Sequence, residues 1–211
     1  MALKIKNRKE LIKIIGLLLI ALSSFFLIYK YFHTERLDQD SENKIEEFFV
    51  EEETNTNDNT SIPVEDNKSN NLALNYNYMA ILEIPSINLK RGLVDPSSKY
   101  NNIKYNVKII YGSSMPNVEN GNFILASHNG ASYISFFKNL DKLNFNDKIY
   151  IYYDGYKYEY SLNNVYEVNK NGKVEINRDY NKTTITLITC KKYSSDTQNV
   201  YIGYLSNKTI Y

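Results

Sequence analysis

The sequence predicts an all-β domain, a barrel or sandwich of short strands, that follows a single apolar helix near the N-terminus. Alternation of side chains in segments such as Ile149–Tyr153 is typical of half-buried strands. The chain has 20 tyrosines and no tryptophan, and such an aromatic content fits a β-rich fold. A charge-free run spans residues 14–29. These three observations define a membrane-proximal helix and a β domain, and the elements follow in chain order.

The apolar run IIGLLLIALSSFFLIY (14–29) is slightly shorter than the ~20 residues of a typical membrane helix. Lys30 can snorkel and extend the span to Phe32. Lysines and an arginine precede the run, so the positive-inside rule places the N-terminus in the cytoplasm and the rest of the chain outside. We therefore expect residues 1–32 to be a cytoplasmic basic stub and a single transmembrane anchor.

A cleaved signal peptide is the alternative for this run, with Ala21, Ser23 and Ser24 as the small residues near a cleavage site. The bulky residues that continue past them, and the aromatic residues up to Phe32, resemble an interfacial belt and favour a retained anchor.

Residues 33–75 are rich in Glu, Asp, Asn, Thr and Ser and lack sustained apolar periodicity. A segment of this composition cannot bury enough apolar surface to order itself. It is predicted to be an acidic flexible linker that lets the following domain reach away from the lipid. Within it, IEEFFV (45–50) is predicted as a short helical turn near the membrane.

Residues 76–211 are predicted to form one β domain. The turn Asp154-Gly155 between two alternating segments is a strong hairpin signal. The spacing of Ile134, Phe137 and Leu140 predicts a short helix over 132–140. The candidate strands are 78–84, 87–94, 122–127, 148–154, 157–168, 183–189 and 199–205.

The bulk composition excludes several classes of function. A formal net charge of +1 does not suit a nucleic-acid partner. One cysteine excludes an intramolecular disulfide, and two histidines leave little for a metal site. Loop acids such as Glu119, Glu175 and Asp179 are read as solvated, so neither a metal nor a cofactor is predicted.

Cys190 and His128 each end a predicted strand, where a rigid scaffold meets solvent. The plainer interpretation is a buried small cysteine and a polar loop histidine. A free thiol outside the cytoplasm is exposed to oxidation, however, so its presence favours a chemical role. An imidazole that meets this thiol in space can carry its proton and later protonate a leaving amine. The pair then predicts acyl transfer through a thioester.

These residues also carry a resemblance. Thr186-Leu187-Ile188-Thr189-Cys190 resembles the TLxTC signature of the sortases, and Ser127-His128-Asn129 resembles their histidine segment. IPSINL (84–89), NGNFILASHNG (120–130) and NDKIYIYY (146–153) occur in the order of that family. The likeness covers about Tyr78 to Leu205.

The resemblance implies a closed eight-stranded sortase-type β-barrel with one or two short helices. It also implies a membrane-anchored cysteine transpeptidase that cleaves an LPxTG-type sorting signal through a thioacyl intermediate on Cys190, with His128 as general acid/base. The implied partners are surface proteins with a C-terminal sorting signal, an amine of the peptidoglycan precursor, and the lipid membrane. Asp95-Pro96 is not followed by an aromatic residue, and the chain ends soon after the last strand; both features resemble protein-anchoring rather than pilin-polymerising members.

Sortases carry an arginine at the start of the strand after the cysteine, and this chain has Gln198 at that position. A glutamine amide donates hydrogen bonds but brings no charge. Three explanations stay open: Gln198 is a weaker donor, a basic residue reaches the site from elsewhere, or the enzyme is slow or inactive. The candidates for such a basic residue are Lys191, Lys192, Arg91 and Arg178. Thr189 is predicted to shape the pocket or to be purely structural.

Two other functions stay open alongside the transpeptidase. One is a catalytically weak or inactive module that binds peptides on the same barrel. The other is a hydrolytic cysteine peptidase, which differs only in using water as the acceptor.

Overall fold

The computed structural model describes residues 8–55 and 77–211, and the chain divides into two compact units, Met1–Glu42 and Asn43–Tyr211. Helix α1 (Arg8–Asn55) contains the segment Leu11–Phe32, which is long and apolar enough to cross a membrane. The helix continues into the predicted linker, so residues 33–55 are helical and the prediction of a flexible segment there is wrong. The rest of that predicted linker, residues 56–75, lies outside the described residues.

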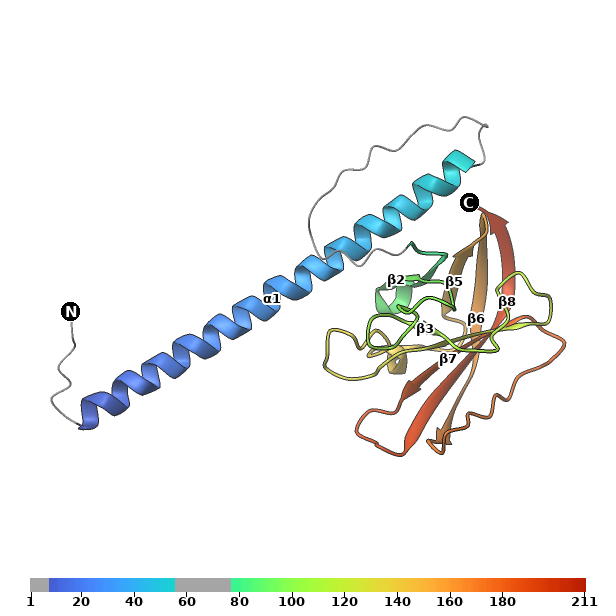
Figure 1. The fold of residues 1–211 in the computed structure, drawn as a ribbon. Helices are drawn as coiled ribbons and strands as arrows, with labels where there is room; N and C mark the ends of the chain where they lie inside the picture. Colours follow the sequence, from blue (N-terminus) through green and yellow to red (C-terminus); the bar gives the residue numbers. More distant parts are fainter. Residues whose placement is uncertain (1–7, 56–76) are drawn as a thin grey trace. The chain divides into compact units, whose positions relative to one another are not determined.

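The second unit contains one eight-stranded sheet whose strand order is β2-β1-β5-β6-β8-β7-β4-β3. Figure 1 draws the long strands β6 and β8 side by side in this unit. All pairings are antiparallel except that of β4 with β7. Strands β2 and β3 are the two edges of the sheet, and among the described residues no pairing joins them. The eight-stranded barrel is therefore nearly, but not fully, closed. The strands are β1 (Ala80–Ile84), β2 (Leu89–Leu93), β3 (Lys108–Ile109), β4 (Asn122–Ala126), β5 (Lys148–Tyr153), β6 (Tyr156–Asn169), β7 (Thr184–Cys190) and β8 (Thr197–Ile210).

Alternation along the strands separates a core face from an outer face. On β7, Ile185 and Leu187 belong to the hydrophobic core, as do Phe123 and Leu125 on β4 and Tyr201 on β8. The residues between them on these strands therefore point to the outer face, because successive side chains of a strand alternate. Cys190 and its neighbour two residues earlier, Ile188, lie on that outer face.

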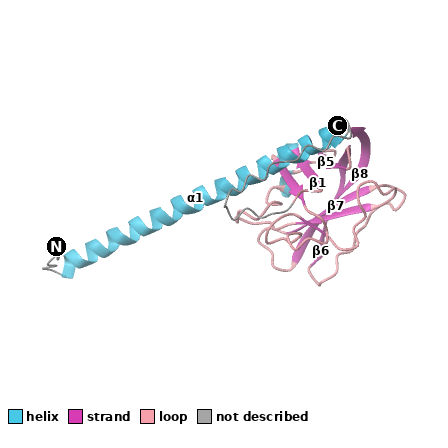
Figure 2. Ribbon diagram, turned by 45° about the horizontal axis from the view of Figure 1, so that its top comes forward, coloured by secondary structure: helices cyan, strands magenta, loops and turns pink. Residues whose placement is uncertain are grey.

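Helix is scarce in this unit, where strands and loops predominate (Figure 2). Two short 3-10 helices are present, η1 (Pro85–Ile87) and η2 (Leu140–Lys142). The predicted helix over 132–140 is wrong, because turns precede η2 there. The backbone N–H of Phe137 donates to the carbonyl of His128 at 3.1 Å, which replaces the bond a helix would make. Phe137 and Leu140 are nevertheless buried, as the apolar spacing indicates.

The end of α1 that belongs to the second unit packs on the barrel. Ile45 and Phe48 are buried in a cluster with Ile81 of β1. Phe49 contacts the rings of Tyr152 and Tyr211 edge-on, with centroids 5.1 and 5.4 Å away. The residues predicted as an isolated helical turn are thus the apolar stripe of a longer helix, and burial of this stripe stabilises helix against the barrel.

Candidate active site

The parallel pairing of β4 with β7 brings the predicted histidine and cysteine segments together. The register runs from Asn122 opposite Thr184 to Ala126 opposite Ile188. The Ser127 N–H donates to the Ile188 carbonyl at 3.3 Å, which continues the contact by one residue. His128 and Cys190 each lie two residues beyond the last pair of this register, and both are partly exposed.

Side-chain hydrogen bonds join the two strand ends. The buried hydroxyl of Thr189 donates to the carbonyl of Ser127 at 2.9 Å. The amide Nδ2 of Asn129 donates to the carbonyl of Cys190 at 2.9 Å. Each bond links a neighbour of His128 to the cysteine segment. Thr189 points to the core face, so it holds the strands together from behind the thiol.

Gln198 lies directly across from Cys190 in the antiparallel pair of β7 and β8. Cross-strand partners of this kind project to the same face with Cβ atoms about 4.5–5.5 Å apart. Gln198 is partly exposed. Gln198 therefore lies at the start of β8 on the same face as Cys190, at the position where the resemblance to the sortases expects an arginine.

None of the four basic residues considered from the sequence is recorded at the sulfur. Arg178 donates to the carbonyl of Asn120 at 3.0 Å and to Thr184 Oγ1 at 3.4 Å. Since Thr184 begins β7 and Cys190 ends it, this guanidinium is about 20 Å from the thiol along the strand. The Arg91 guanidinium lies over the ring of Phe136, 4.3 Å from its centroid.

The two lysines that follow Cys190 are held by carboxylates. Lys191 Nζ contacts Glu167 Oε1 at 2.7 Å, and Lys192 Nζ contacts Asp141 Oδ2 at 2.7 Å. Glu167 pairs with Asn199, and Asn199 pairs with Thr189. The pattern of alternation thus places the Lys191 ion pair on the face opposite Cys190.

A different lysine contacts the thiol. Lys170 Nζ lies 3.7 Å from Cys190 Sγ. Lys170 directly follows β6, and its backbone N–H donates to the carbonyl of Asp196 at 2.7 Å. Neither Lys170 nor Asn129 was singled out from the sequence. Asn129 was visible as part of the histidine segment, whereas the position of Lys170 depends on which strands pair with β8.

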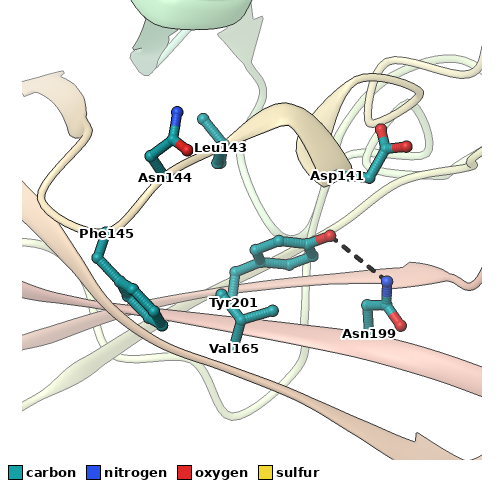
Figure 3. A pocket seen from close by; sticks show the side chains of 7 residues that line it. All are labelled: Asp141, Leu143, Asn144, Phe145, Val165, Asn199 and Tyr201. Atoms are coloured by element: carbon teal, nitrogen blue, oxygen red, sulfur yellow. Dashed lines mark hydrogen bonds between the residues drawn. The ribbon is translucent and has the colours of Figure 1, made fainter.

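A pocket of about 390 Å³ lies on the other face of the sheet (Figure 3). Within it, Asn199 Nδ2 donates to the Tyr201 hydroxyl at 3.4 Å, and burial raises the pKa of Tyr201. Tyr201 pairs with Leu187, a core-face residue, so the pocket does not contain the thiol. It is lined by Asp141, Leu143, Asn144, Phe145, Val165, Asn199 and Tyr201.

Comparison with known proteins identifies the family. The family model described as a sortase domain matches residues 82–204, a span that includes the histidine segment, the cysteine and Gln198. The chain belongs to the sortase family. The predicted family is thus confirmed, and the match falls inside the domain predicted over 76–211.

Individual relatives are similar to a large part of the chain. Sortase A of Bacillus anthracis is 30% identical over 122 residues, which cover 58% of this chain and 56% of that protein. The structure of sortase A from Listeria monocytogenes has a TM-score of 0.54 at 21% identity, covering 64% of this chain and 90% of that one. A Clostridium perfringens sortase D5 transpeptidase has a TM-score of 0.54 at 20% identity, covering 80% and 98%.

These likenesses establish the eight-stranded sortase fold. The chain spans little more than half the length of the curated Bacillus anthracis relative.

Proposed function

We propose that this protein is a membrane-anchored sortase, a cysteine transpeptidase that cleaves an LPxTG-type sorting signal and transfers the acyl group to an amine. The observation that carries the proposal is the parallel register of β4 and β7, which supports a placement of His128 beside Cys190 because each lies two residues past the last pair and each is partly exposed. A thiol and an imidazole placed side by side are the minimum machinery for acyl transfer through a thioester.

In the first half-reaction, the Cys190 thiolate attacks the threonine carbonyl of the signal. The carbon–nitrogen bond to glycine breaks, and His128 protonates the departing amine as general acid. The sorting peptide is left as a thioester on Cys190. Gln198, directly across from Cys190, donates a hydrogen bond to the carbonyl oxygen as charge develops on it.

In the second half-reaction, His128 removes a proton from the incoming amine as this amine attacks the thioester carbonyl carbon, and the carbon–sulfur bond breaks to release the Cys190 thiolate. The proposed acceptor is an amine of the peptidoglycan precursor, and the proposed donors are surface proteins with a C-terminal sorting signal. Thr189 takes no part in these steps. Its hydrogen bond to Ser127 holds the two strand ends at the spacing that the proton transfers need.

The apolar segment Leu11–Phe32 supplies the anchor in this proposal. Basic residues precede it, and the positive-inside rule then leaves the N-terminus in the cytoplasm and the barrel on the outer surface. A catalytic domain on that side of the membrane meets exported proteins and the growing cell wall. Cysteine labelling tests this orientation, because Cys190 is the only thiol and an impermeant maleimide should label it in intact cells.

The decisive experiment incubates the full-length protein in detergent micelles with a small library of sorting peptides and measures intact mass. A thioacyl adduct on the wild type, absent from Cys190→Ala, is expected. Adding an amine such as oligoglycine should discharge the adduct and produce a ligated peptide.

Each alternative has its own outcome. Peptide binding without an adduct would indicate a binding module, and release of peptide at a rate that the amine does not change would indicate a hydrolase. Turnover by the Cys190→Ala variant would overturn the proposal itself.

A further inference from the structure

The ammonium group of Lys170 is the positive charge recorded at the thiol. Its Nζ is 3.7 Å from Cys190 Sγ. Two further observations indicate that the backbone determines this contact. Lys170 N–H is bonded to the Asp196 carbonyl at 2.7 Å, and Lys170 lies two residues beyond Val168, which pairs with Gln198.

The alternation of side chains places the whole group on one surface. Val168 pairs with Gln198, and Gln198 pairs with Cys190, so these three side chains project to the outer face. Lys170 continues the alternation from Val168 to the same face. One row therefore crosses three adjacent strands, from the end of β6 through the start of β8 to Cys190 at the end of β7.

The neighbouring lysines differ from Lys170 in their partners. Lys191 and Lys192 each lie 2.7 Å from a carboxylate, whereas within residues 77–211 no ion pair to a carboxylate is recorded for Lys170. Among the described residues, the polar contact recorded for its ammonium group is the one with the sulfur.

We propose that Lys170 is a catalytic residue of this site, whose ammonium group stabilises negative charge on the Cys190 sulfur and on the oxygen of the carbonyl group whose carbon the sulfur attacks. From the residue that directly follows β6, it supplies the charge that the family resemblance expects from an arginine at the position of Gln198. The inference rests on the proposed role of Cys190 as the nucleophile. Gln198 then contributes a neutral hydrogen bond, and the site regains a cation from a strand one place further along the sheet.

Alkylation of the only thiol in the chain tests the charge without any sorting peptide. The thiolate is the form that reacts with iodoacetamide. A unit charge at this distance in an exposed site changes the reaction rate by roughly two- to fivefold. Full-length Lys170→Met in detergent should therefore be alkylated two- to fivefold more slowly than wild type at pH 7 and low salt, whereas Lys170→Arg should stay near the wild-type rate.

Lys191→Met is the matched control, because it removes the same charge from the residue next to Cys190 but on the opposite face. Its alkylation rate should stay within about twofold of wild type, since its ion pair is exposed. High salt should narrow the gap between wild type and Lys170→Met, because salt screens exposed charges.

A compensating variant tests the relation to the missing arginine. In Lys170→Met, kcat/KM for a sorting peptide should fall at least about tenfold, because one stabilising group for the oxyanion is lost. Adding Gln198→Arg to that variant should restore most of the rate. The same change in the wild type should add little, because a cation is already present.

The outcomes separate this inference from the proposed function. Alkylation of Lys170→Met at the wild-type rate, or an equal loss in Lys191→Met, would overturn the role of Lys170. Failure of the wild type to form an adduct with any sorting peptide would instead overturn the proposed function, whatever the alkylation rates.

Discussion

Thr189→Val is the sharpest test of how the two halves of the site are held together. The substitution keeps the size and shape of the side chain but replaces the hydroxyl by a methyl group. Thr189 is 2% exposed, and its hydroxyl donates to the Ser127 carbonyl at 2.9 Å. Its loss removes the side-chain bond that joins the end of β7 to the residue before His128.

The magnitude follows from the burial of this bond. A buried hydrogen bond contributes about 0.5–1.5 kcal/mol net, and a partner left unsatisfied raises the cost toward 3 kcal/mol. We expect the free energy of unfolding to fall by about 1–2 kcal/mol, which for a domain of this size lowers Tm by roughly 3–7 °C. We also expect acylation of Cys190 by a sorting peptide to slow roughly tenfold, because a small misplacement of the two reacting groups is costly.

Thr186→Val is the matched control. Thr186 is also buried on β7 and also bonds to a residue of β4, since its hydroxyl donates to Asn122 Oδ1 at 2.9 Å. Its free energy of unfolding should fall by a similar amount, about 1 kcal/mol, while acylation of Cys190 stays near the wild-type rate. Urea unfolding followed by circular dichroism and intact-mass kinetics measure the two quantities. Equal acylation rates in the two variants would refute the positioning role of Thr189.

Predictions for three other variants concern stability. Tyr160 is fully buried, and its hydroxyl has no partner among the described residues, so Tyr160→Phe should raise the free energy of unfolding by about 0.5–2 kcal/mol at pH 7, measured by urea titration. Burial also raises the pKa of Tyr160, so as pH rises this tyrosine ionises in the unfolded chain before it does so in the folded one. The free energy of unfolding should therefore fall as pH rises above about 10. This fall should be less steep in Tyr160→Phe, and an unchanged slope would contradict this reasoning. The Lys148 ammonium, 2.7 Å away, lowers the pKa of Glu159. The stability that this pair contributes is present above about pH 4.3 and is lost as pH falls further. Between neutral and acid pH, the free energy of unfolding should therefore fall less in Lys148→Met than in wild type, by a difference of less than about 1 kcal/mol. Phe48→Ala should lower the free energy of unfolding of the barrel by about 2–4 kcal/mol because it opens a cavity against Ile81, and a Tm equal to that of wild type would show that the end of α1 does not stabilise the barrel.

Local patterns were enough to predict seven of the eight strands. Strands β5 and β6 bury one face and therefore alternate, whereas residues 184–189 of β7 are buried on both faces and show a continuous run of apolar and β-branched residues instead. Strand β3 was missed because it has only two residues, Lys108–Ile109, too few to show a period. The order of apolar and polar side chains along a strand is a property of the segment itself, so it is visible in the sequence.

The errors arose where a distant contact decides the local structure. The segment 132–140 has helical spacing, but the Phe137 N–H bonds to the His128 carbonyl, which fixes the histidine loop at the expense of a helix. The acidic segment after residue 32 lacks apolar periodicity as a whole, yet Ile45 and Phe48 supply enough apolar contact with Ile81 to anchor a helix there. Composition averages over such small stripes and therefore predicted a flexible linker.

The identity of the cation at the thiol depends on strand pairing, which the sequence does not specify. The motifs locate Cys190 and His128 at strand ends. The family pattern has an arginine at the start of the strand after the cysteine, and this chain has Gln198 there. Whether Lys170 reaches the same sulfur depends on β6 pairing with β8 in a register that aligns Val168 with Gln198; a shift by one residue would turn Lys170 to the opposite face. A cationic side chain can approach the sulfur from any strand that borders this face. The reaction therefore requires a positive charge near Cys190, but it does not require that this charge come from one particular position in the sequence.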